Sequence, residues 1–163
     1  YTDDSASSDS SSSEGSGASG CFPKGTLIAM SNGTQKPIEL LEVGEEVVSY
    51  NERQKVFSSS KVTSVLKVHS SDIHKINESL RVTDTHPFWV FNKGWSVIEP
   101  TKQKIDLGHK QLAMGDELLK LDGQVENIFS ITKEGGEEET VYHLKDVLPD
   151  RTFFAGGFLV HNK

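Results

Sequence analysis

Short apolar segments separated by turn residues constrain this chain more than any other feature of its sequence. Residues 26–30, 46–50 and 62–68 are rich in β-branched and other apolar side chains, and Asn, Asp, Ser and Gly lie between such segments. No stretch of ten or more residues shows a sustained helical spacing of apolar side chains. The sequence therefore predicts an all-β fold. Further strands are expected at 74–76, 79–82, 88–91, 95–98 and 158–160.

An internal repeat underlies these segments. Residues 41–48 resemble residues 112–119, because a glycine, an acidic pair and an apolar pair occur in the same order in both. Residues 62–68 resemble residues 125–131 in the same way. Two copies in the same order predict two similar halves related by a pseudo-two-fold axis.

The first 20 residues differ from the rest of the chain in composition. Serine dominates residues 1–20, with Gly, Ala and acidic residues among them, so they have too little apolar surface to offset the entropy lost on ordering. We expect a disordered flank or linker at 1–20, one folded domain at 21–162 and a flanking residue at 163. The apolar content of 34% is sufficient for a core of that size.

Charge and hydropathy exclude several classes of function. The formal net charge is −7, and residues 1–20 hold four acidic residues and no Lys or Arg, which leaves −3 for residues 21–163. This mildly acidic body lacks the basic stripe of a nucleic-acid-binding protein. No apolar run is long enough to span a membrane. We therefore expect a soluble monomer without a nucleic-acid or membrane partner.

Cys21 is the only cysteine, and it lies where the serine-rich segment meets the predicted domain. A single cysteine forms no intramolecular disulfide, so its thiol is either buried and inert or reactive. A self-cleaving chain needs a nucleophile at this position. Attack of the Cys21 sulfur on the Gly20 carbonyl would turn the peptide bond into a thioester, provided that the fold distorts that bond or protonates its nitrogen.

Thr83 and His86 form a second candidate site. Side chains at i and i+3 point to opposite faces of a regular strand, so these two converge only if residues 83–86 form a turn. In a turn, the Thr83 hydroxyl would hold the scissile amide while His86 protonates the departing amine of Cys21. The alternative for His86 is a structural histidine.

His161 and Asn162 form the third candidate site. An asparagine amide nitrogen that attacks its own main-chain carbonyl forms a succinimide and breaks the following bond, here the bond to Lys163. His161 would donate a proton to the carbonyl oxygen or to the leaving amine. The apolar residues 158–160 predict a buried strand that anchors this pair.

Together these pieces resemble the intein and hedgehog-type autoprocessing (Hint) family, in particular its bacterial intein-like subgroup. The resemblance covers residues 21–162. It rests on Cys21-Phe22-x-x-Gly25-Thr26, Thr83-x-x-His86-Pro87-Phe88, Val141-Tyr142-His143-Leu144 and Phe153-Phe154-Ala155-x-Gly157-Phe158-Leu159-Val160-His161-Asn162.

The resemblance implies a horseshoe-shaped all-β fold with pseudo-two-fold symmetry. It also implies an autocatalytic, single-turnover domain, inserted in a larger host protein, that cleaves its own terminal peptide bonds without cofactor or metal. Its partners would be its flanking sequences, with small thiols, water or amines as acyl acceptors.

Two departures from the family pattern bear on the chemistry. Typical inteins are followed by Cys, Ser or Thr, whereas Lys163 has no side chain that accepts an acyl group in this way. The family often has Asp and His where this chain has His143 and Arg151. We expect His143 to act as an acid-base partner in Asn162 cyclisation. Arg151 would offer only a permanent positive charge.

Three alternatives remain open at this stage. The domain is a device that only cleaves and never ligates, an inert β module that keeps the fold, or a conventional cysteine protease. The protease leaves the terminal His161 and Asn162 unexplained. The other histidines, His69, His74 and His109, match no motif and are expected to be surface or structural residues.

Overall fold

A computed structural model describes residues 20–102 and 108–162, and these residues form an all-β protein, as the sequence predicted. Two 3-10 turns, η1 (Ile38–Leu40) and η2 (Pro100–Lys102), interrupt the strands. In chain order the strands are β1 (Phe22–Pro23), β2 (Leu27–Ala29), β3 (Gln35–Pro37), β4 (Glu46–Asn51), β5 (Val56–Ser70), β6 (Ile73–Ile76), β7 (Leu80–Thr83), β8 (Phe88–Val90), β9 (Gly94–Val97), β10 (Lys110–Gln111), β11 (Glu117–Leu119), β12 (Val125–Asn127), β13 (Ile131–Lys133), β14 (Glu139–Leu148), β15 (Thr152–Ala155) and β16 (Phe158–His161).

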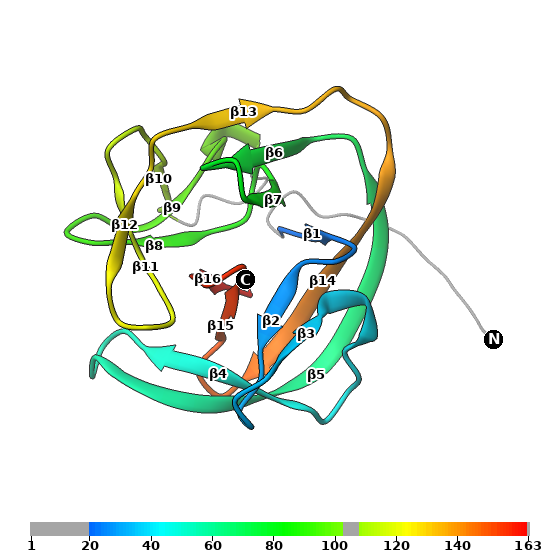
Figure 1. Cartoon of the computed structure of the whole chain (residues 1–163), viewed down its shortest axis with the longest axis vertical. Coiled ribbons are helices and arrows are strands. Elements are labelled where there is room, and N and C mark those ends of the chain that lie inside the picture. Colours follow the sequence, from blue (N-terminus) through cyan, green and yellow to red (C-terminus); the bar gives the residue numbers. More distant parts are fainter. Residues whose placement is uncertain (1–19, 103–107, 163) are drawn as a thin grey trace.

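The longest strands form the outer frame of the molecule. β14 pairs antiparallel with β5 from Glu139↔Ser70 to Leu148↔Lys61, and the two strands curve together along one side in Figure 1. β1 pairs with the other edge of β14, and β4 pairs with β5. Figure 1 shows β1, β2, β15 and β16 inside this frame. The curled arrangement confirms the horseshoe-shaped fold.

Backbone hydrogen bonds confirm the internal repeat and correct part of its alignment. Gly44 N–H donates to the Val62 carbonyl at 2.7 Å, and Gly115 N–H donates to the Ile128 carbonyl at 2.8 Å. Both glycines have φ near +90°, a conformation that other residues rarely adopt. Val62 therefore corresponds to Ile128, so the predicted match of Val62 with Val125 was wrong by three residues. Both segments are apolar and alternating, so sequence similarity did not fix their register.

A matched ion pair supports each half of the repeat. Lys36 Nζ lies 2.8 Å from Glu45 Oε2, and Lys93 Nζ lies 2.8 Å from Asp116 Oδ2. Each carboxylate also accepts a backbone N–H three residues earlier in the chain, at 2.9 Å in both halves. The acidic residue after each glycine thus has the same structural role in both halves.

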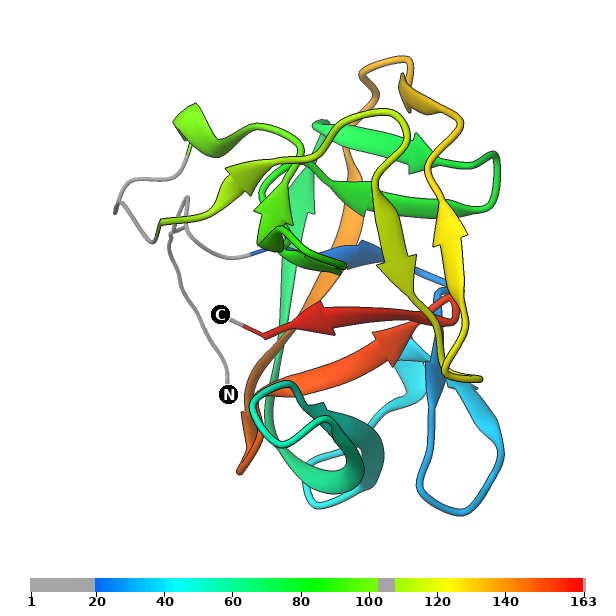
Figure 2. The same ribbon diagram turned by 90° about the vertical axis from the view of Figure 1, so that its left-hand side faces the viewer.

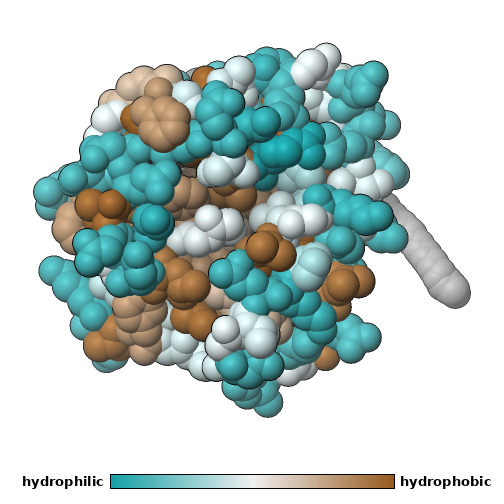
Figure 3. Space-filling view, viewed as in Figure 1, coloured by the Kyte–Doolittle hydropathy of each residue, from teal (hydrophilic) through white to brown (hydrophobic). Residues whose placement is uncertain are grey.

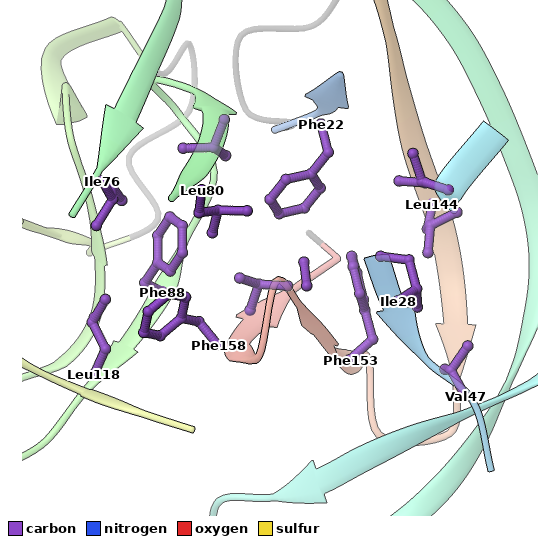
Figure 4. Packing of buried hydrophobic residues seen from close by; sticks show 14 of the residues in the cluster. Phe22, Ile28, Val47, Ile76, Leu80, Phe88, Leu118, Leu144, Phe153 and Phe158 are labelled. Atoms are coloured by element: carbon purple, nitrogen blue, oxygen red, sulfur yellow. The ribbon is translucent and has the colours of Figure 1, made fainter. Parts of the chain in front are cut away.

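Aromatic side chains fill the space between the frame and the central strands. Phe22, Phe88 and Phe153 are at most 1% exposed. Figure 4 shows Phe22 and Phe153 pointing toward the middle of the core, where their ring centroids lie 6.1 Å apart. Truncation of such a side chain to alanine typically costs about 3–5 kcal/mol of stability. Phe22 follows Cys21 directly, so its burial fixes the position of the thiol.

The sequence analysis misjudged two regions. The strand predicted at 62–68 is part of the much longer β5. β14 pairs with β5 from Lys61 to Ser70 and so extends the strand beyond the predicted residues. The sequence analysis also missed the role of the acidic residues that follow β13, where Arg81 binds Glu134 at 2.7 Å and Glu139 at 2.5 Å. These pairs join the loop to β7, which carries Thr83 at its end.

Most of the surface in Figure 3 is hydrophilic, and hydrophobic residues gather toward the centre of that face. Among the described residues, no helix has the length and apolar character needed to cross a membrane.

Candidate functional site

Cys21 sits at the entry to the fold, between two strands. Phe22 pairs with Tyr142 of β14 on one side, and Thr83 N–H donates to the Cys21 carbonyl at 3.0 Å on the other. Figures 1 and 2 both place β1 close to β16, the strand that ends at His161. The fold therefore brings the start and the end of the predicted domain together, as the sequence analysis required.

Thr83 lies at the end of β7 and binds the amide between Gly20 and Cys21. The Cys21 N–H donates to Thr83 Oγ1 at 2.8 Å, and the same hydroxyl donates to the Cys21 carbonyl at 3.2 Å. Asp84 and Thr85 form the turn that was predicted after Thr83. The turn carries the chain from Thr83 to His86, so both side chains reach the bond between Gly20 and Cys21.

The Cys21 thiol lies in an apolar pocket. Cys21 is 7% exposed and packs against Ile73 and Val141. Burial raises the pKa of the thiol to about 12, because the thiolate would lose its hydration there. The thiol is therefore protonated at neutral pH, so an attack by its sulfur would have to include the transfer of that proton.

His86 is enclosed by aromatic rings and by Gly20. Its ring centroid lies 4.3 Å from that of Phe22, and a Cβ added to Gly20 would lie 2.2 Å from the Cβ of His86. Only glycine therefore fits before Cys21 in this arrangement. Neither nitrogen of the His86 ring has a hydrogen-bond partner among the described residues.

The environment of His86 keeps it neutral. Burial lowers its pKa to about 3, the positive charge of His143 and, more weakly, that of His161 lower it too, and the adjacent Gly20 backbone offsets only part of this. His143 and His161 therefore both lie within electrostatic reach of His86, although they come from β14 and β16. His86 and His143 both contact Gly20, and His161 acts on His86 through its charge.

His143 contacts the carbonyl of Gly20. Its Nδ1 lies 2.9 Å from the Gly20 oxygen, and because a carbonyl only accepts, Nδ1 carries the proton and donates. Burial lowers the pKa of His143, and the Gly20 contact raises it by less. The sequence analysis had assigned His143 to Asn162. The structure places it at Gly20, because β14 runs beside β1, and its part in Asn162 cyclisation stays a prediction.

These two depressed pKa values predict that the protein loses stability as the pH falls below about 6.5. Unfolded His86 takes up a proton near pH 6.5, whereas folded His86 stays neutral down to about pH 3, so protonation favours the unfolded state in that window. His143 contributes with the same sign. Each such proton corresponds to about 1.4 kcal/mol per pH unit.

Urea unfolding between pH 5 and 8 measures this effect while most carboxylates stay ionised. The His86→Gln variant has no ring to protonate. Its free energy of unfolding should therefore decrease less steeply as the pH falls, by the slope that corresponds to about one proton. An identical slope in the two proteins would contradict the burial of a neutral His86.

Asn162 is 4% exposed, just past the end of β16. Its backbone N–H donates to the Arg151 carbonyl at 2.9 Å. With the side-chain amide oriented so that both ends are satisfied, Nδ2 also donates to Arg151 O at 2.9 Å, and Oδ1 accepts from the N–H of Val147 at 2.7 Å and of Asp146 at 2.6 Å. The Arg151 guanidinium instead pairs with the Asp146 carboxylate at 3.6 Å, and both side chains are exposed.

His161 is held from both sides. Its backbone N–H donates to the Pro87 carbonyl at 3.2 Å, which ties β16 to the residue after His86. Its ring lies 4.8 Å from the ring of Trp95, edge to face. The sequence analysis did not predict this contact of Trp95 with His161. The only sequence signal for it was that a large aromatic residue lies in β9, the strand that pairs with β8.

An ion pair behind the Thr83–His86 turn was also missed. Lys102 Nζ lies 2.6 Å from Asp84 Oδ2 and 3.5 Å from Asp72 Oδ1. The Asp84 side chain is only 5% exposed, so the lysine compensates a carboxylate that has lost most of its hydration. This pair fixes the turn between the two predicted site residues. Asp84 lies inside the T-x-x-H motif, but nothing in the sequence pointed to its partner.

Other predicted features fall outside the site. Within 20–102 and 108–162, no three His, Cys, Asp or Glu side chains gather as a metal site would need. His69 is exposed beside Thr140, and His74 is buried in β6 with Nδ1 unpaired among the described residues. Lys163 and residues 1–19 of the predicted flank lie outside the described residues.

Comparison with known sequences gives one family. Residues 22–123 match the family described as Ataxin-1 and HBP1 module (AXH). Ataxin-1 of Mus musculus and Ataxin-1 of Homo sapiens are each 30% identical over 112 residues, which is 61% of this chain and 14% of the relative. This chain thus spans about one seventh of the length of the curated relatives that it matches.

Comparison with solved structures gives the fold. A bacterial intein-like domain from Clostridium thermocellum has a TM-score of 0.71 at 24% identity, over 87% of this chain and 98% of that one. A DnaB intein from Synechocystis sp. has a TM-score of 0.71 at 23% identity, over 89% of this chain and 99% of that one. The TvoVMA intein has a TM-score of 0.68 at 18% identity, over 91% of this chain and 100% of that one. The described residues therefore have the intein (Hint) fold.

Proposed function

This chain belongs to the Ataxin-1 and HBP1 module (AXH) family and has the intein fold, and from this premise we propose that it processes itself by breaking the peptide bonds on either side of residues 21–162. A general role in self-processing accords with the intein neighbours. The steps below are inferred from the contacts of this chain's own residues, because a fold alone does not establish a reaction.

The first step is an acyl shift at Gly20. The Cys21 sulfur forms a bond to the Gly20 carbonyl carbon, the bond from that carbon to the Cys21 nitrogen breaks, and the thiol proton ends on the freed amine. The His143 Nδ1–H lies at the oxygen that becomes negative during attack. Thr83 Oγ1 accepts from the nitrogen that takes up the thiol proton and leaves as an amine. Both hydrogen bonds strengthen along the reaction, which is the requirement for catalysis.

His86 would carry the proton in this step. Its ring packs against Gly20, and its low pKa leaves it neutral, with a nitrogen lone pair for the thiol proton. The same low pKa makes it a weak base toward a thiol whose pKa is about 12, so it holds that proton only while passing it to the departing amine. A neutral imidazole that takes a proton in a dry site becomes a strong acid, so it readily passes that proton to the departing amine. Among the described residues neither nitrogen of the buried ring has a hydrogen bond of normal geometry, and the Gly20 backbone is the polar group that raises its pKa, so the ring is placed to exchange a proton at Gly20.

The second step is cyclisation of Asn162. The Asn162 side chain attacks its own main-chain carbonyl, with His161 as the donor to the departing Lys163 amine. Trp95 holds the His161 ring, and the Pro87 carbonyl holds its backbone. The thioester from the first step then passes to water, to a small thiol or to an amine. If the freed Lys163 amine takes it, the flanks become joined without a side-chain acceptor.

One observation carries this proposal. Both polar atoms of a single peptide bond are bound by side chains remote in sequence, the nitrogen by Thr83 and the oxygen by His143. Backbone pairing would satisfy these atoms equally well, so a fold that only needed stability would not require two buried polar side chains here.

Intact-mass spectrometry of the purified chain, incubated with and without dithiothreitol, tests the proposal. The expected result is thiol-dependent loss of residues 1–20, release of Lys163, and no loss of 1–20 from a Cys21→Ala variant. The Asn162→Ala variant should keep Lys163 while residues 1–20 are still released. An unchanged wild-type mass over days would reject autoprocessing.

A non-catalytic β module is the second candidate. The AXH match covers residues 22–123 and so leaves out Cys21, His143 and Asn162, which favours a family whose shared feature is the scaffold. The mass experiment separates the two candidates, since a scaffold leaves both flanking bonds intact.

A further inference from the structure

The side-chain oxygen of Asn162 lies in a cradle of two consecutive backbone N–H groups. The N–H of Asp146 lies 2.6 Å from Oδ1, and that of Val147 lies 2.7 Å from it. Successive N–H groups of a regular strand point in opposite directions, so one acceptor cannot bind both. This pair within β14 is therefore a local departure from strand geometry.

The departure has a visible backbone cause. Asp146 has a φ of +61°, although its neighbours Lys145 and Val147 pair normally with β5. Aspartate is among the few non-glycine residues that tolerate this region. The carbonyl of Asp146 accepts from Thr63 Oγ1 at 2.5 Å, which holds the turned peptide in place. Two such N–H groups aimed at one point form an anion-binding nest.

We propose that the Asp146–Val147 amide pair is a catalytic element of the C-terminal cleavage: it activates Asn162 by stabilising negative charge on its side-chain oxygen. This inference rests on the proposed function, because it concerns the reaction proposed for Asn162. It assigns to a kink in β14 a role that was expected of side chains.

The chemistry of the step explains why the oxygen matters. A neutral carboxamide nitrogen is a poor nucleophile because its lone pair is delocalised onto oxygen. When Nδ2 loses a proton, the resulting negative charge resides largely on Oδ1, where the two N–H donors lie. Nδ2 then bonds to the main-chain carbonyl carbon of Asn162, and the bond from that carbon to the Lys163 nitrogen breaks. The proton from Nδ2 ends on the Lys163 amine.

Arg151 contributes its backbone to the same device. Its carbonyl oxygen accepts from both Nδ2 and the backbone N–H of Asn162. These contacts hold the nucleophilic nitrogen next to its own main chain. The Arg151 guanidinium is not part of the device, since it extends to the exposed carboxylate of Asp146.

Substitutions to valine at two residues of positive φ test this inference. Valine strongly disfavours positive φ, so Asp146→Val should turn the peptide and remove the nest. Release of Lys163 should then slow by about 10²-fold, the effect of losing one preorganised donor. The matched control is Lys55→Val, because Lys55 has a φ of +60° in the exposed turn between β4 and β5. This variant bears similar strain and should release Lys163 at the wild-type rate.

A second readout does not depend on cleavage. In a ¹⁵N spectrum of the folded chain, Asn162→Ala should move the amide protons of Asp146 and Val147 to higher field and hasten their hydrogen exchange. If wild-type protein keeps Lys163 but shows these shifts, the nest exists and the proposed function fails. Unmoved amide resonances, or an Asp146→Val variant that releases Lys163 as fast as Lys55→Val, would overturn the inference.

Discussion

Replacing Thr83 with valine is expected to slow thiol-induced loss of residues 1–20 by about 10²- to 10³-fold, while the protein remains folded. Valine matches threonine in shape but lacks the hydroxyl that accepts from the Cys21 N–H at 2.8 Å. The variant also leaves that buried N–H unpaired, which destabilises the fold by about 1–3 kcal/mol. Intact-mass time courses give the rate, and urea unfolding shows that the variant is folded.

Thr83→Ser is the matched control for this experiment. Serine keeps the hydroxyl and loses only a methyl group, so it should restore most of the rate even though it changes the packing. If the Thr83→Val variant lost residues 1–20 at the wild-type rate, the role given to the hydroxyl would be contradicted. Equal loss in both variants would point to packing around Thr83 instead of its hydrogen bond.

Replacing His143 with leucine is the change with the second large effect, and should slow the same cleavage by about 10²-fold or more. Leucine fills a similar volume but donates no hydrogen bond to the Gly20 oxygen. Release of Lys163 should be affected far less, because the Asn162 amide is bound by β14 and Arg151 backbone groups. Following both cleavages in one mass experiment measures the two effects side by side.

His143→Asn separates the hydrogen bond from the imidazole. The asparagine side-chain nitrogen occupies nearly the position of Nδ1 and donates as it does, but it does not titrate. Recovery of most of the rate would mean that His143 acts as a donor to the oxyanion. A variant as slow as His143→Leu would mean that the imidazole itself moves a proton. If the His143 variants released Lys163 more slowly but lost residues 1–20 at the wild-type rate, His143 would act at Asn162, as the sequence analysis expected.

The fold could be predicted from the sequence because its signals are local. Short alternating segments such as 46–50 become strands wherever turn residues bound them, and the glycine at 44 or 115 marks the same turn in both halves. Register was not predictable. The pairing of β5 with β14, and hence the alignment of Val62 with Ile128, depends on contacts between residues far apart in the chain.

The sequence was sufficient to choose the residues of the candidate site, but it predicted only some of the contacts between them. Cys21, Thr83, His86 and Asn162 were chosen because each residue type suits one step, and the structure places the first three around one peptide bond. The contact of His143 with Gly20 spans 123 positions, so the strand path alone decides it. The Asn162 nest was invisible to the sequence, because it is made of backbone atoms.

The family and the fold describe different parts of the same molecule. The AXH match begins one residue after Cys21 and ends before β13, so it contains Thr83 and His86 but neither terminal residue. The likeness to inteins spans 87–91% of the chain in the three structures compared, well beyond the residues of the AXH match. Whether both ends react is therefore the property that separates a working autoprocessing domain from the shared scaffold.

The most direct test of the central claim observes the Gly20–Cys21 bond itself. Cys21 is the only cysteine, so a chain labelled with ¹⁵N-cysteine and with ¹³C at the glycine carbonyls has a single labelled peptide bond in an HNCO spectrum. The account predicts that this cross-peak weakens with time while a glycine carbonyl signal appears at the lower field of a thioester. Dithiothreitol should then remove the thioester signal as residues 1–20 are released. A cross-peak that persists at full intensity, with no thioester signal in the wild type, would contradict the account.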